Sequence, residues 1–180
     1  CPVGCGLLRV PVAGRVRGTW HLMTGKPYLM RIIGFGLRRP KNRVPGVDVA
    51  GTVVAVGSAV TRFTVGDEVF GMSRGSFAEY AAAREDKLAH KPSGCTFEQA
   101  ATLGISGGTA LQAIEAGKVR ARQRVLRSGA SGGVGSCAVH LAKAARAEGN
   151  GACSTETGAL VMPAAPAQGA DITRTAVADE

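Results

Sequence analysis

A glycine-rich turn between a short apolar segment and an amphipathic segment constrains the fold of this chain more than any other feature. Residues 125–127 read Val-Leu-Arg, and in the turn 128–135 that follows them four of eight residues are glycine. Five apolar residues then recur with the spacing of one helix face: Val134, Ala138, Leu141, Ala142 and Ala145. The pattern predicts a strand, a tight turn and a helix that stops near Gly149.

This order of elements is typical of sites that hold phosphate groups. Glycine lets a backbone approach a ligand closely, and the first N–H groups of a helix lack internal partners and carry partial positive charge. A strand, a glycine turn and a helix N-terminus together suit a pyrophosphate. The motif Ala130-x-Gly132-x-x-Gly135 keeps the last two glycines of the dinucleotide fingerprint, with alanine in the first place. The alternative is an ordinary glycine-rich turn that binds nothing.

Length and composition narrow the class of protein. A chain of 180 residues allows one domain or two small ones. It has no apolar run of 18 residues, so we expect no membrane span, and no signal peptide is recognisable at its start. Its five cysteines form no CxxC pair, which favours reduced thiols and a cytoplasmic location. The first residue is not Met, so we expect a trimmed or incomplete start.

The net charge of +9 is concentrated in the first quarter of the chain. Residues 1–47 hold nine Lys or Arg and no Asp or Glu. A basic segment of this kind can bind nucleic acid or an anionic ligand. Its densest part, 37–43, has no interleaved aromatic residues and matches no nucleic-acid module. We therefore expect a solvated loop and no nucleic-acid partner, with a phosphate-bearing cofactor or an acidic surface as the alternative.

The chain before residue 95 is predicted to be rich in strands. Four segments combine β-branched or alternating apolar residues with turn signals: 7–12, 47–57, 64–71 and 76–81. Short strands of this kind favour a small barrel or sandwich. After them Thr96 and Gln99 fit a capping box for a helix to about Leu103, and a second helix is predicted from Thr109 to Ala116.

Four blocks of residues, in the right order and spacing, resemble the medium-chain dehydrogenase/reductase superfamily in its zinc-independent, quinone-oxidoreductase-like branch. The match extends over about residues 12–147. The blocks are Val44-Pro45-Gly46-Val47-Asp48-Val49-Ala50-Gly51-Thr52-Val53, Val65-Gly66-Asp67-Glu68-Val69, Gly75-Ser76-Phe77-Ala78-Glu79-Tyr80 and Ala130-Ser131-Gly132-Gly133-Val134-Gly135.

The resemblance implies an α/β fold with a GroES-like β-barrel domain over 1–95. Residues 96–180 would then hold linking helices and a partial Rossmann domain with a parallel βαβ unit. It also implies an NADPH-dependent oxidoreductase that transfers a hydride to a quinone, enone or carbonyl substrate without zinc. Zinc-dependent members carry a cysteine near Thr19 and a His-Glu pair where this chain has Val47 and Asp48, so we expect no metal. A homodimer is left open.

The resemblance assigns cofactor contacts residue by residue. Ala130, Ser131, Gly132, Gly133 and Val134 would contact the pyrophosphate, and Thr109 would open the helix that faces the nicotinamide. Ser154 and Thr155 fall where an acidic residue would select NADH, and small hydroxyl residues there favour NADPH, with NADH as the alternative. Tyr28 is a candidate for the substrate pocket, although a plain core or surface tyrosine is an equal alternative. No residue is assigned as a general acid.

The sequence also departs from the family. The second strand of the βαβ unit would be Glu148–Cys153, which is poor strand material, and relatives are about twice as long in the Rossmann part. We therefore expect a truncated copy that exposes an apolar sheet face and associates. A non-catalytic dinucleotide-binding fragment or interaction module is the alternative to an active enzyme.

Overall fold

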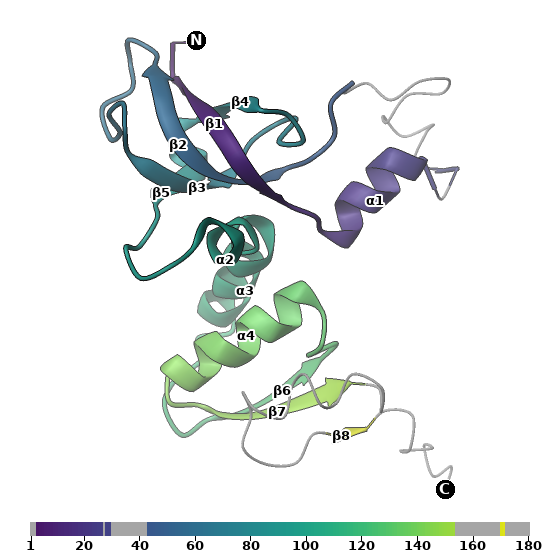
Figure 1. Cartoon of the computed structure of the whole chain (residues 1–180). Coiled ribbons are helices and arrows are strands. Elements are labelled where there is room, and N and C mark those ends of the chain that lie inside the picture. The colour runs from purple at the N-terminus through teal and green to yellow at the C-terminus, as the bar shows by residue number, and fades with distance from the viewer. Residues whose placement is uncertain (1–2, 27, 30–42, 154–169, 172–180) are drawn as a thin grey trace, which may run out of the picture. The chain divides into compact units, whose positions relative to one another are not determined.

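The computed structural model describes residues 3–26, 28–29, 43–153 and 170–171, and the chain divides into two compact units. The first unit is Cys1–Ile105 and the second is Ser106–Glu180. Figure 1 shows the elements of each unit along the chain.

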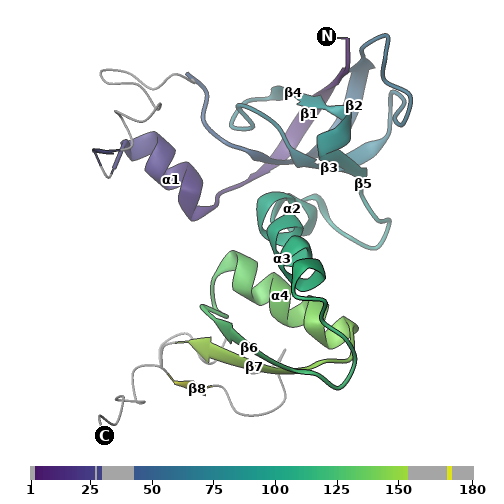
Figure 2. The ribbon, with the colours of Figure 1, turned by 180° about the vertical axis from the view of Figure 1, so that it is seen from behind.

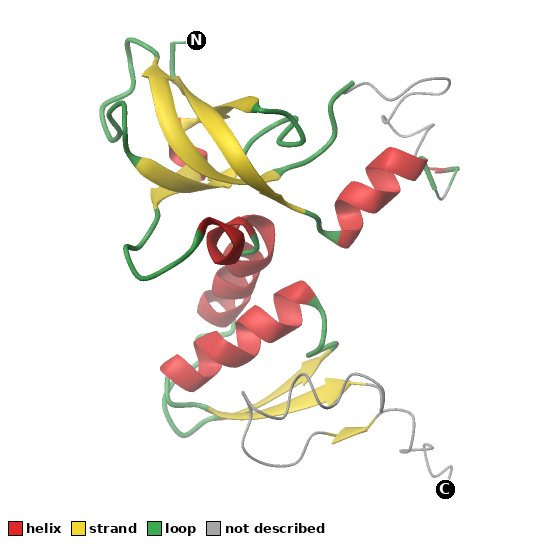
Figure 3. Cartoon of the chain, in the orientation of Figure 1, coloured by secondary structure: helices red, strands yellow, loops and turns green. Residues whose placement is uncertain are grey.

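Five antiparallel strands form the sheet of the first unit, drawn in yellow in Figure 3. Their order across the sheet is β4-β1-β2-β3-β5. In chain order they are β1 (Cys5–Gly14), β2 (Asp48–Val56), β3 (Glu68–Met72), β4 (Tyr80–Arg84) and β5 (Leu88–His90). A short 3-10 helix, η2 (Glu85–Lys87), joins β4 to β5.

Besides a smaller cluster of Ala50, Ala100 and Ala101, the sheet buries a core of mainly aliphatic side chains. Alternation along the strands brings these residues to the inner face, because successive side chains of a strand point to opposite faces. The core consists of Leu8, Val49, Val53, Phe63, Val69, Ala83 and Leu88. Only one of its members is aromatic, in keeping with the 4% aromatic content of the chain.

An irregularity in β1 accommodates a proline within a central strand. The register of β1 against β2 shifts between Arg9 and Val12, and Pro11 lies inside this shift. Proline has no N–H to donate to a ladder, so a break in pairing is the expected way to keep it there. Gly51 of β2 lies against the break, where a Cβ would overlap the carbonyl oxygen of Arg9.

The strand predicted over 76–81 is wrong in position, because β4 begins only at Tyr80. The residues before it are held by the loop that precedes β2. The N–H groups of Gly75 and Phe77 donate to the carbonyl oxygens of Gly46 and Pro45 at 3.0 and 3.1 Å. Their hydrogen bonds are therefore used in loop contacts and not in a strand ladder.

Two helices of the first unit differ in how well the sequence signals them. The helix α2 (Phe97–Ala101) begins with the predicted capping box, since the Gln99 N–H donates to Thr96 Oγ1 at 3.3 Å and the Thr96 N–H donates to Gln99 Oε1 at 3.0 Å. It packs against β1, β2 and β3. The helix α1 (Arg17–Thr24) was not predicted, and it ends on Gly25, which has φ +61°.

The next helix begins earlier than predicted. The helix α3 (Gly104–Ala116) starts five residues before Thr109 and runs through two glycines at 107 and 108. Asp48 Oδ1 accepts the Ile105 N–H at 2.6 Å, which satisfies a donor in the first turn from a strand 57 residues away. A partner this distant in sequence overrides the low helix propensity of glycine.

The second unit contains a parallel βαβ arrangement. Its strands β6 (Arg124–Ser128), β7 (Glu148–Cys153) and β8 (Ala170–Asp171) lie in that order in one parallel sheet, and α4 (Gly133–Ala144) connects the first two. Figures 1 and 2 both show α4 along one face of β6 and β7, and α4 contacts both strands. The strand predicted from 124 and the helix after the glycine turn are thus present.

Two details of this unit differ from the prediction. The helix α4 ends at Ala144, not near Gly149, because Arg146 adopts φ +56° and turns the chain into β7. Residues 148–153 form a strand although their composition is poor for one. Pairing with β6 in register over Arg124–Ser128 supplies the ladder that intrinsic propensity does not.

Candidate dinucleotide-binding site

The glycine turn between β6 and α4 is closed by its own backbone. Gly129 adopts φ +69°, a left-handed conformation that glycine reaches without steric cost. Its carbonyl oxygen accepts the Gly132 N–H at 3.0 Å. Ala130, the residue in the first position of the fingerprint, is fully buried beneath the turn.

Two of the glycines are required by the packing of the turn itself. A Cβ on Gly135 would overlap the Gly129 carbonyl oxygen and lie 2.7 Å from the Ala130 Cα. A Cβ on Gly133 would lie 2.7 Å from the Ser106 hydroxyl oxygen of α3. Contacts with neighbouring atoms of the protein thus explain why these two positions are glycine.

Gly132 has no such internal reason to be glycine. Its φ is −76°, which any residue can adopt, and a Cβ there would meet only the Gly129 carbonyl oxygen at 3.4 Å. It is the N-cap of α4, a position where Asp, Asn or Ser would stabilise the helix by about a few tenths of a kcal/mol relative to glycine. The backbone at Gly132 is exposed and bare, so a molecule from outside the chain can approach it.

The N-terminus of α4 is electrostatically suited to an anion. Its cap makes no side-chain hydrogen bond and its first turn has no acidic residue. The first intrahelical bond runs from the Ser136 N–H to the Gly132 carbonyl at 2.8 Å, so the N–H groups of the preceding turn point beyond the helix end. Ser131 is half-buried, and Val134 is exposed. The described residues therefore fit a pyrophosphate group held by backbone N–H donors.

The structure brings α3 to the glycine turn through Ser106, a residue that the sequence reasoning missed. Ser106 is buried and lies against Gly133. Thr109, the candidate for the nicotinamide side, is exposed and lies three residues further along α3, on the same face as Ser106. In the sequence, Ser106 is distinguished only by the glycines around it at 104, 107 and 108. Such a pattern does not indicate a binding site.

The remaining candidates are not brought into this turn. Ser154 and Thr155 lie outside the described residues, so their role stays a prediction. Tyr28 belongs to the first unit and is 65% exposed, and its place in a substrate pocket also stays a prediction.

Cys137 lies in the second turn of α4. Its side chain is half-buried, and burial raises the pKa of the thiol, which outweighs the opposite effect of the hydrogen bond with Ser136. A raised pKa leaves the thiol protonated. Cys137 therefore packs as a small apolar side chain beside the turn.

Within the described part of the chain, no three His, Cys, Asp or Glu side chains gather closely enough to hold a metal ion. The expectation of a zinc-free protein stays a prediction. No helix among these residues has the length and apolarity needed to cross a bilayer.

Comparison with known proteins assigns the first part of the chain. Residues 6–93 match the family described as the alcohol dehydrogenase GroES-like domain. This match confirms the GroES-like domain predicted from the sequence.

Individual relatives match a longer part of the chain than the domain family does. The chain is 44% identical over 121 residues to the quinone oxidoreductase of Sus scrofa, a match that covers 66% of this chain and 37% of that protein. It is 41% identical over 114 residues to the chloroplastic NADPH-dependent alkenal/one oxidoreductase of Arabidopsis thaliana, covering 58% of this chain and 30% of that one. The chain thus spans about a third of the length of these relatives.

A solved structure agrees with these matches. The crystal structure of an alcohol dehydrogenase superfamily protein from Novosphingobium aromaticivorans superposes with a TM-score of 0.80 at 30% identity, over 95% of this chain and 52% of that one. Fold, motif order and relatives together define a dehydrogenase-type α/β protein. The chain belongs to the medium-chain dehydrogenase/reductase superfamily, in its quinone-oxidoreductase-like branch.

Proposed function

We propose that the chain binds NADPH at the glycine turn and serves hydride transfer to a quinone, enone or carbonyl substrate without a metal. The observation that carries the proposal is the bare N-cap of α4, where Gly132 offers backbone to a ligand although nothing inside the protein requires glycine. The names of two relatives, a quinone oxidoreductase and an NADPH-dependent alkenal/one oxidoreductase, support the substrate class.

In this reaction, the role of the protein is to bind and orient the cofactor and the substrate. A bound nicotinamide cofactor supplies the hydride, so the protein has to hold its two partners in a reactive geometry. The N–H groups of the first turn of α4 would hold the pyrophosphate, with Ser131 and Val134 beside them. Thr109 would orient the nicotinamide end from the face of α3 that also carries Ser106.

The domain assignment is part of the same proposal. Residues 1–95 form the GroES-like domain, and residues 96–180 comprise the linking helices and a partial Rossmann domain built on β6, α4 and β7. The parallel pairing of β6 with β7 through a helix supports this assignment. A cytoplasmic location and a homodimer remain proposals that accompany it.

A calorimetric titration with NADPH and then NADH tests the proposal, with Gly132→Asp as the decisive variant. Asp fits the space at Gly132 and is a favourable N-cap, so α4 should stay folded or become more stable. Its carboxylate occupies the place of the pyrophosphate and repels it, so binding should weaken by at least about tenfold. Tighter binding of NADH than of NADPH would overturn the cofactor preference.

Two matched variants separate charge from size and position. Gly132→Asn has the same shape as the Asp variant without the charge, and it should keep more of the affinity. Gly94→Asp places the same charge on an exposed loop glycine with no atom within 4 Å, and it should bind as the unaltered chain does. Equal binding by the Gly132→Asp and Gly94→Asp variants would refute the site.

The alternative is a non-catalytic dinucleotide-binding fragment or interaction module. It is favoured by the coverage, since the chain matches only 37% of the length of the Sus scrofa enzyme. Turnover of a quinone or an alkenal with NADPH separates the two. Binding without turnover would assign the chain to the alternative.

A further inference from the structure

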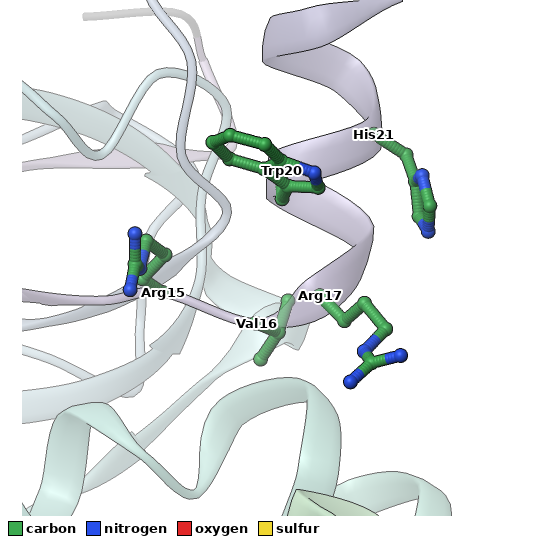
Figure 4. Close-up of a pocket in the computed structure, with 5 residues that line it drawn as sticks. All are labelled: Arg15, Val16, Arg17, Trp20 and His21. Carbon is green, nitrogen blue, oxygen red and sulfur yellow. The ribbon is translucent and has the colours of Figure 1, made fainter. Parts of the chain in front are cut away.

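A cavity lies in the first unit, at the start of α1. It has a volume of about 390 Å³ and is lined by Arg15, Val16, Arg17, Trp20 and His21. In Figure 4, Arg15 lies on the segment before the helix, on the same side as the Trp20 indole. Arg17 and His21 project from the other side of the helix.

The lining has apolar side chains on one side of the helix and polar ones on the other. Val16 and Trp20 are four residues apart along the chain, and so are Arg17 and His21. Trp20 is 52% exposed, although indole is among the most apolar side chains. A flat apolar surface close to guanidinium groups suits a ligand that combines a flat apolar body with a negative charge.

The positive charge of this cavity is not neutralised by neighbours in the sequence or by the ion pairs observed. Residues 1–47 contain no acidic residue. The ion pairs between described residues are Arg84–Asp86, Lys87–Asp86 and Lys91–Glu68, none of which involves the cavity. The N-terminus of α1 adds to this charge, because its cap Val16 makes no side-chain hydrogen bond and its first turn has no acid.

His21 is held in place by the backbone. Its Nδ1 lies 2.9 Å from the Lys26 carbonyl oxygen, and because a carbonyl only accepts, Nδ1 carries the proton of this bond. The bond anchors the ring by one nitrogen and leaves Nε2 of the neutral ring as an acceptor, so His21 borders the cavity without pairing with an anion. Arg15 supplies a planar guanidinium on the Trp20 side that can bind a carboxylate through two parallel hydrogen bonds.

We propose that this cavity binds a small carboxylate carried on a flat unsaturated or aromatic body. The carboxylate pairs with Arg15, which lies on the Trp20 side, and the flat body stacks on Trp20 against Val16. Arg17 contributes positive charge from the other side of the helix. We also assign this ligand as the substrate class of the enzyme. That assignment rests on the proposed oxidoreductase function, whereas the binding of the ligand in the cavity does not.

Trp20 is the only tryptophan of the chain, so its fluorescence reports on this cavity alone. We would titrate the full chain, without cofactor, with benzoate, benzamide and inorganic phosphate. Benzoate should change the emission with saturation, at least about tenfold more tightly than the neutral benzamide, because it adds charge-assisted hydrogen bonds. Phosphate should bind more weakly than benzoate, because it has no flat body to stack on the indole.

A pair of charge-matched variants locates the effect. Arg15→Gln should weaken benzoate binding by about tenfold. Arg9→Gln removes the same charge from an exposed position of β1 outside the cavity, and it should change the affinity less than about twofold. Circular dichroism establishes that both variants are folded, and calorimetry repeats the titration independently of fluorescence.

Several results would overturn the inference. These are equal binding of benzoate and benzamide, phosphate binding as tight as benzoate, an equal loss in both variants, or no saturation by about 10 mM benzoate. Because this titration contains no cofactor, failure of NADPH to bind the glycine turn would refute the proposed function and leave the cavity result unaffected. If turnover is found, a carboxylate-bearing enone should show a raised KM with Arg15→Gln, and an unchanged KM would refute the assignment as a substrate site.

Discussion

Glycine residues in the turn between β6 and α4 have two different roles at the scale of single atoms. Gly135 and Gly133 are glycines because neighbouring atoms of the protein fill the space that a Cβ needs. Gly132 has that space and a backbone conformation open to any residue. A sequence motif records the three glycines alike, and only packing separates the structural positions from the one with open space above its backbone.

Alanine substitutions should separate these roles. Gly135→Ala forces a methyl group into the Gly129 carbonyl, so we expect a loss of at least about 2 kcal/mol in the free energy of unfolding, measured by urea denaturation. Gly132→Ala should stay within about 0.5 kcal/mol of the unaltered chain. Equal effects of the two substitutions would show that the turn is packed differently.

Asp48 should make the stability of the chain depend on pH. It is fully buried, and desolvation raises the pKa of its carboxyl above 3.8 despite the hydrogen bond from Ile105. The folded state therefore holds the proton more tightly than the unfolded state, so the stabilising contribution is complete below pH 3.8 and is lost as the pH rises through the folded-state pKa. Asp48→Asn should gain stability relative to the unaltered chain between pH 4 and pH 8, measured by urea unfolding. A difference that does not change with pH would contradict the buried state of this carboxyl.

At the scale of elements, α2 offers a local test because its start is signalled by a capping box between Thr96 and Gln99, three residues apart. Thr96→Ala removes the acceptor of the Gln99 N–H and should cost about 1 kcal/mol of unfolding free energy. The control is Ser93→Ala, which removes an exposed hydroxyl from the turn before the helix and should have little effect. If both substitutions cost the same, the capping box would not stabilise the helix.

Elements with local signals were predictable from the sequence, and those set by distant partners were not. The β-branched run of β2 and the capping box of α2 specify their own structures. The start of α3 depends on the Asp48 carboxylate, and β7 depends on its ladder with β6. The glycine turn was predictable for the same local reason as α2, whereas Ser106 reaches it only through the packing of α3.

At the scale of the whole molecule, the charge of the chain is uneven. The net charge is +9, and its excess lies in residues 1–47. A field of this sign attracts any anion, including a dinucleotide with a 2′-phosphate, whether or not specific side chains recognise that phosphate. Two explanations of an NADPH preference therefore exist, namely the general field and the local hydroxyl groups of Ser154 and Thr155.

Salt should distinguish the two explanations. The Debye length falls from about 10 Å at 0.1 M salt to about 3 Å at 1 M, so a preference that arises from the general field should shrink several-fold over this range. A preference that arises from direct contacts at the 2′-phosphate should persist, because close pairs are screened much less. We expect the ratio of the NADH and NADPH dissociation constants to fall with salt but to stay above one, measured by calorimetry at both concentrations. A ratio that is insensitive to salt would assign the preference to local contacts alone, and a ratio of one at 1 M salt would assign it to the charge of the whole chain.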